Sequence, residues 1–140
     1  MGIKERWYRS KPLPPDIRER IDMLPSLFKE KGVMLAYLFG SLLNTKGNDV
    51  DIALLYEGAF GDIRRDIHKM LGTSRVDIVN LKSAHLLISF EVISTGKILF
   101  RLNEDTENLF ELKIIKQYQD FGPVRNKQLI YLKENLDIGI

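Results

Sequence analysis

The chain has 140 residues, the size of one compact domain, and is too short for a large multidomain enzyme. Apolar residues make up 44% of it and charged residues 29%, which excludes disordered and collagen-like classes. It has no cysteine and a net charge of +2, so a disulfide scaffold, a thiolate metal site and a cysteine nucleophile are excluded, and direct nucleic-acid binding is not indicated. The two histidines, His68 and His85, lie in no metal-binding spacing, and we interpret both as solvated surface residues.

Residues 1–13 show no periodicity and carry four basic side chains, so we expect an N-terminal arm. The arm is polar, and no apolar run approaches the roughly 20 residues that span a bilayer. We therefore expect no membrane contact and a cytoplasmic location. Pro14 and Pro15 then open a helix that Pro25 should kink or split and that Gly32 should end.

Strand and helix patterns alternate in the central part of the chain. Apolar runs of strand length predict strands at residues 33–39, 49–56, 75–81 and 97–101. Apolar residues at helical spacing predict one helix over residues 59–71 and another that starts after Ser83, its expected N-cap, and ends near Gly96. We therefore expect an α/β (α+β) fold with a small, mixed, twisted sheet of about four strands and flanking helices.

The C-terminal part of the chain is predicted to be helical. Residues 106–121 carry apolar side chains on one broad face, which we expect to belong mainly to the core, with part of it left for a partner. Gly122-Pro123 should break this helix before a last amphipathic stretch. We expect residues 1–140 to form a single domain, with the arm at 1–13, a catalytic core at 14–101 and a helical extension at 104–136.

The dipeptide Gly40-Ser41 follows the first predicted strand directly. A glycine here lets the backbone come close to a ligand, and if Ser41 opens a helical turn, its free N–H groups and hydroxyl can hold a phosphate. Taken alone, the dipeptide also fits an ordinary strand-to-helix turn with a serine cap.

Three aspartates accompany this dipeptide. Asp49 and Asp51 alternate with apolar residues and so share one face of a strand, where a divalent magnesium ion would offset their repulsion. Asp77 lies inside an apolar strand, where an isolated carboxylate is costly, so it should face the same pole. Three carboxylates on two strands suit a site with two metal ions. The simpler alternatives are a turn residue and a solvated residue for the Asp pair, and an ion pair with Arg75 or Arg101 for Asp77.

In this order, Gly40-Ser41, Asp49-x-Asp51 and Asp77 resemble the signature of the DNA polymerase β-like nucleotidyltransferase superfamily. The short length and the helical tail resemble the minimal nucleotidyltransferases, in particular the MNT antitoxins of MNT–HEPN toxin–antitoxin pairs. The resemblance implies an enzyme that moves AMP from ATP onto a hydroxyl. It also implies that the acceptor is a tyrosine of a HEPN ribonuclease toxin, which is silenced, so a hetero-oligomer with the toxin is expected.

Carried over by position, the resemblance assigns the site residues. Gly40 and Ser41 hold the triphosphate, Asp49 and Asp51 bind two Mg²⁺ ions, and Asp77 binds the catalytic ion and helps deprotonate the acceptor. Many relatives have a longer loop with a basic residue soon after the Gly-Ser, and here Lys46 is assigned to supply that charge. Two alternatives stay open: an antitoxin that has lost catalysis and acts by binding, and a nucleotidyltransferase acting on a small molecule.

Overall fold

The computed structural model describes residues 12–40 and 49–136. Two short helices, α2 (Ile17–Ile21) and α3 (Leu24–Lys31), open this part of the chain. Pro25 lies in the first turn of α3. Backbone N–H groups in the first turn have no acceptor within the helix, so a proline there removes no helical hydrogen bond. The expected split of the first helix is therefore confirmed. Gly32 ends α3 with a left-handed φ of 80°, as its position predicts.

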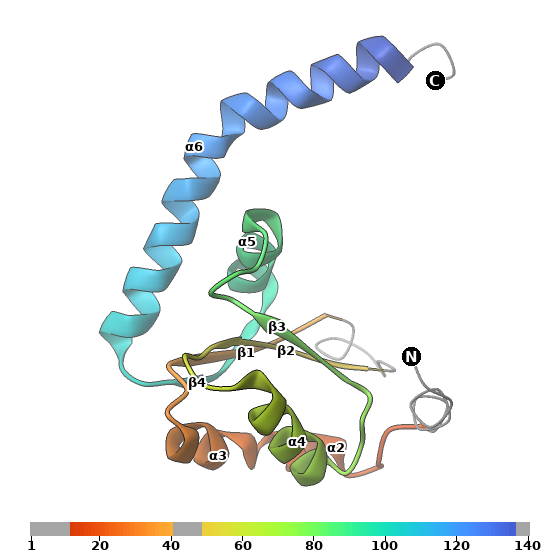
Figure 1. Ribbon diagram of the computed structural model, residues 1–140, viewed down its shortest axis with the longest axis vertical. Helices are drawn as coiled ribbons and strands as arrows, with labels where there is room; N and C mark the ends of the chain where they lie inside the picture. The colour runs from red at the N-terminus through yellow and green to blue at the C-terminus, as the bar shows by residue number, and fades with distance from the viewer. Residues whose placement is uncertain (1–11, 41–48, 137–140) are drawn as a thin grey trace.

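Four strands form one mixed sheet in the order β3-β2-β1-β4 (Figure 1). β1 (Leu35–Phe39) runs antiparallel to β2 (Val50–Leu55) and to β4 (Lys97–Arg101), whereas β3 (Val76–Asn80) runs parallel to β2. All four strands lie where the apolar runs predict them, and the mixed sheet of about four strands is confirmed. Because β3 pairs only with β2 within the described residues, it is an edge strand of this sheet.

The first face of the sheet is covered by α2, α3 and α4 (Phe60–Leu71) (Figure 1). Helix α4 connects the two parallel strands, and it ends at Gly72 with a left-handed φ of 70°. The alternate residues of β2 that point to this face are fully buried against the helices. This core includes Phe28, Ile52, Leu54, Ile63 and Ile67.

The second face is covered by α5 (Leu86–Thr95) and by α6 (Glu104–Leu136) (Figure 1). Phe110 and Ile114 of α6 are buried in this core. The hydroxyl of the buried Tyr37 donates a hydrogen bond of 2.6 Å to the carboxylate of Glu111, which ties α6 to β1. Tyr118 of α6 also stacks on an aromatic ring of α5.

Helix α6 is continuous from Glu104 to Leu136 and contains Pro123, so the predicted break at Gly122-Pro123 is wrong. Proline removes one backbone hydrogen bond and crowds the preceding turn, and a helix can absorb this by bending. Figure 1 shows α6 bent, with its C-terminal part extending away from the sheet. Despite the length of α6, no helix in the described part of the chain combines the length and apolarity that crossing a bilayer requires.

The predicted N-cap at Ser83 and the predicted solvent exposure of His68 need correction, whereas His85 is exposed as predicted. The N-cap of α5 is His85, whose Nδ1 accepts a hydrogen bond of 3.1 Å from the Leu87 N–H. Ser83 belongs instead to the turn after β3, where its N–H donates to the Asn80 carbonyl. His68 is half-buried on α4, with its Nε2 atom inside the protein. A cap depends on backbone geometry, and burial depends on packing, so neither could be predicted from local sequence alone.

Candidate active site

Gly40 ends β1 in a conformation that other residues rarely adopt. Its φ is 81°, in the left-handed region. A Cβ atom added to Gly40 would overlap Oδ2 of Asp51, because Asp51 lies opposite Phe39 on the neighbouring strand. Glycine is therefore required both by the turn and by the close approach of the Asp51 carboxylate. The other two residues predicted to hold the triphosphate, Ser41 and Lys46, lie outside the described residues.

Asp51 and Asp77 lie directly opposite each other in the parallel pairing of β2 and β3. Their neighbours Val50 and Val76 point into the core of the first face, so both carboxylates point to the second face. Asp77 is exposed because it is on the edge strand, which corrects the expectation that burial makes its charge costly. The sheet register brings the two carboxylates together.

The fold disfavours the ionised form of the Asp51 carboxylate. Burial, then the charge of Asp77, then the charge of Asp49 raise the pKa of Asp51 from 3.8 to about 6. Each cause acts in the same direction, because desolvation and like charges both disfavour the ionised carboxylate. A divalent cation beside Asp51 would remove both penalties.

Asp49 is paired with a residue that the sequence analysis did not assign to the site. Nε of Arg75 donates a hydrogen bond of 3.3 Å to Oδ1 of Asp49, and the Arg75 carbonyl accepts one of 2.9 Å from the Val50 N–H. The Arg75 side chain is 13% exposed and that of Asp49 is 43% exposed. The sequence contained one signal for this pair: the spacing is the same in Asp49-x-Asp51 and in Arg75-x-Asp77. This spacing predicts a contact between Asp49 and Arg75 only when the two strands are known to be parallel and in register.

Three carboxylates and one guanidinium therefore meet at this end of the sheet. Oxygen ligands of this kind suit a hard divalent cation such as Mg²⁺. Within residues 12–40 and 49–136, however, no group of three or more histidine or acidic side chains forms a metal-binding arrangement. Asp51 and Asp77 already lie in register, whereas Asp49 pairs with Arg75. The donor set fits the ion if Asp49 exchanges its contact with Arg75 for the ion.

The sequence of this chain matches known proteins over the same region. Residues 23–105, which include Gly40 and all three aspartates, match the family described as polymerase beta, nucleotidyltransferase. A curated relative, the protein adenylyltransferase MntA of Shewanella oneidensis, is 35% identical over 94 residues. The alignment covers 62% of this chain and 67% of that protein.

Solved structures of toxin–antitoxin complexes share the fold. A toxin–antitoxin complex with AMP-PNP contains a chain that matches with a TM-score of 0.65 at 26% identity, covering 81% of this chain and 97% of that chain. A complex of the tri-AMPylated Shewanella oneidensis HEPN toxin with its MNT antitoxin matches with a TM-score of 0.67. Its identity of 24%, over 83% of this chain and 98% of that one, supports the fold alone.

Proposed function

This chain belongs to the polymerase beta nucleotidyltransferase family, and from that premise we propose that it transfers AMP from ATP to a hydroxyl of a partner protein. The observation that carries the proposal is the approach of the Gly40 backbone to the Asp51 carboxylate, which lies in register with Asp77 on the neighbouring strand. The relation to a protein adenylyltransferase supports AMP as the transferred group. The structure with AMP-PNP supports ATP as the donor. We infer a cytoplasmic location, because the proposed reaction consumes ATP.

The proposed acceptor is a tyrosine of a HEPN-family ribonuclease toxin, which makes this chain its antitoxin. The fold that it shares with antitoxin chains supports this assignment, as does the AMPylated state of the toxin in one of those complexes. Phe110 and Ile114 of α6 are buried against the sheet, which supports treating the core at 14–101 and the helical extension at 104–136 as one domain. Most of the predicted arm at 1–13 lies outside the described residues.

The site residues then have distinct tasks. Two Mg²⁺ ions held by Asp49, Asp51 and Asp77 would offset charge on the phosphates and make the acceptor hydroxyl more acidic. Gly40 and Ser41 position the triphosphate, and Lys46 adds a positive charge beside it. Asp77 is exposed, so the acceptor can reach it, and it takes the acceptor proton. The acceptor oxygen bonds to the α-phosphorus of ATP as the bond to the departing pyrophosphate breaks.

A second function is favoured by a specific contact. Asp49 pairs with Arg75, and the described residues contain no closed group of metal ligands. An antitoxin that neutralises its toxin by binding, without transfer, is consistent with this arrangement.

Transfer between purified proteins separates the two functions. The toxin is incubated with Mg²⁺ and ATP labelled at the α-phosphate, together with the native chain or the Asp51→Asn variant. The matched control is Asp66→Asn, which removes a carboxylate that pairs with Lys31 on the surface. Label on the toxin with the native chain and the control, and none with Asp51→Asn, supports transfer. A toxin that is neutralised but unlabelled in all three reactions supports the binding function.

A further inference from the structure

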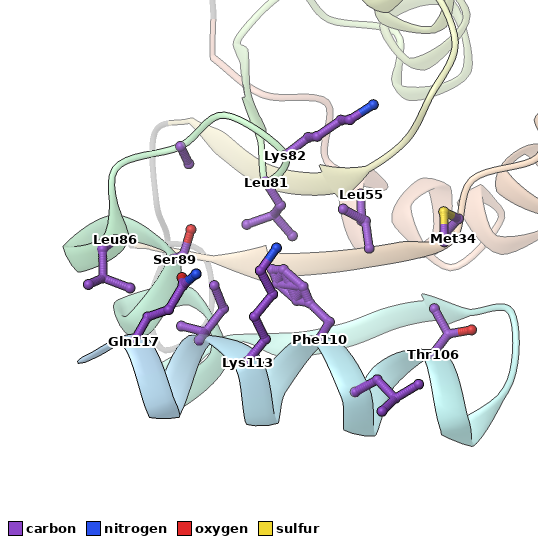
Figure 2. A pocket seen from close by; sticks show the side chains of 13 residues that line it. Met34, Leu55, Leu81, Lys82, Leu86, Ser89, Thr106, Phe110, Lys113 and Gln117 are labelled. Carbon is purple, nitrogen blue, oxygen red and sulfur yellow. The ribbon is translucent and has the colours of Figure 1, made fainter. Parts of the chain in front are cut away.

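A cavity of about 490 Å³ lies between α6 and the end of the sheet opposite to the carboxylates (Figure 2). Met34 before β1, Leu55 at the end of β2 and Leu81 after β3 line its strand side, and Phe110 lines its helix side. The acidic residues lie instead where β1 ends and where β2 and β3 begin. A strand of this length spans roughly 17–20 Å, so the cavity is separate from the proposed nucleotide site.

Among the described residues, the charged side chains that line this cavity are Lys82 and Lys113, and the lining contains no acidic residue. Lys82 forms an ion pair with Glu57, and Figure 2 shows its side chain extending away from α6. Lys113 reaches from α6 toward the strand side in the same view, and it has no ion pair within the described residues. The cavity therefore offers an apolar lining and one positive charge that a ligand can neutralise.

Apolar side chains continue from the cavity onto the outer surface of α6. Leu109 lines the cavity and is 69% exposed, and Leu112, three residues further along the helix, is 63% exposed. The two exposed leucines and the apolar hollow form one continuous apolar surface, and such surfaces mark protein interaction sites.

We propose that this groove, formed by the cavity together with Leu109 and Leu112, binds an acidic amphipathic segment of the partner toxin. An apolar side chain of the segment enters the cavity, and a carboxylate pairs with Lys113. The identity of the partner rests on the proposed function, whereas the chemistry of the segment rests on the groove itself. The toxin is then anchored at the end of the sheet opposite to the carboxylates. Its acceptor hydroxyl, on another part of the toxin, reaches the carboxylates.

A second copy of this chain fits the groove less well than an acidic partner. In a symmetric dimer the same surface of each copy meets the other. The cavity lining would then bring lysines together with no carboxylate of its own to pair with them. An acidic segment of a different protein would supply the carboxylate that Lys113 lacks.

Binding is measured between the purified full chain and the HEPN-family toxin expected to be encoded beside its gene, by calorimetry without ATP or Mg²⁺. The test variant is Leu109→Ser with Lys113→Glu. The control is Ile115→Ser with Lys116→Glu, which makes the same changes at exposed positions of α6 that do not line the cavity. We expect Kd to rise about tenfold or more in the test variant and to stay within about twofold in the control. Thermal unfolding verifies that both variants fold.

Native-like binding by the test variant, or an equal loss in both variants, overturns the proposal. So does a dimer of the native chain alone that the test variant dissociates, because a second copy would then occupy the groove. AMP transfer by the native chain is measured separately. Transfer with unchanged binding by the test variant overturns the groove and leaves the proposed function standing. Groove-dependent binding without transfer supports the groove and overturns the proposed transfer. A native chain that does not bind the toxin overturns both proposals.

Discussion

Two regions on the second face of the sheet, one around Tyr37 and one around Asp51, differ in what their polar groups do for stability. Near the middle of β1, Tyr37 and Glu111 satisfy each other with a hydrogen bond and fasten α6 to the sheet. At the start of β2, Asp51 lies near two other carboxylates, those of Asp49 and Asp77. Its pKa is raised because burial and these like charges disfavour its ionised form. The presence of a polar group that stabilises the fold is accounted for by that stabilisation. A polar group that lowers stability is instead a candidate for a functional role.

Asp51→Asn should have the largest effect on activity. Removing one ligand of the proposed ions should lower the rate of AMP transfer by about a hundredfold or more. The same change removes a repelled, partly buried charge, so the free energy of unfolding should rise in the absence of divalent cations. Transfer rates and urea unfolding of both proteins are measured. A variant that is less stable and still active would contradict the distinction between the two regions.

Gly40→Ala should lose both activity and stability. An alanine at this φ costs about 1 kcal/mol, and its Cβ would displace the Asp51 carboxylate. Gly32→Ala is the matched control, since Gly32 has φ 80° and no atom within 4 Å of an added Cβ. The control should lose about 1 kcal/mol of stability and keep its transfer activity. Equal transfer by the two variants would remove Gly40 from the site.

Tyr37→Phe should affect stability and leave the chemistry unchanged. The substitution leaves the Glu111 carboxylate without its hydrogen bond, which should cost about 1–3 kcal/mol in the free energy of unfolding. Chemical denaturation followed by circular dichroism measures the loss. Tyr37→Phe combined with Glu111→Gln should recover part of it, because no unpaired charge is then left beside the core. No change in the single variant would show that α6 is held by its apolar contacts alone.

The pH dependence of stability should show the smallest effect. The folded pKa of Asp51 is about 6 against an ordinary 3.8, so between these values the folded state binds more protons than the unfolded state. The contribution of Asp51 to stability therefore falls as pH rises from about 4 to 6 and is constant above that range. Melting temperatures of the native chain and of Asp51→Asn, measured in EDTA from pH 4 to 7, should diverge in favour of the variant. Parallel curves would mean that Asp51 titrates normally.

The sequence was sufficient to predict features that depend on local chemistry. Apolar runs located all four strands, and Gly32 and Gly72 end their helices because only glycine adopts the left-handed conformation without cost. The position of Gly40 directly after β1 was also visible, since a glycine that ends a buried apolar run is a local signal.

Features that depend on the arrangement of the strands could not be predicted in this way. Asp77 was expected to be buried, but the strand order places it on an edge strand. Arg75 joins the site only because β2 and β3 are parallel and in register. The continuity of α6 through Pro123 likewise reflects how a helix bends, which the Gly-Pro pair does not reveal.

We propose that the carboxylates at the start of β2 serve AMP transfer to the partner toxin. The most direct test is the intact mass of the toxin after co-expression with the native chain and with the variant Asp49→Asn, Asp51→Asn. We predict one or more added AMP units with the native chain and none with the variant. An unmodified toxin in a stable complex with both proteins would contradict the claim and leave an antitoxin that acts by binding alone.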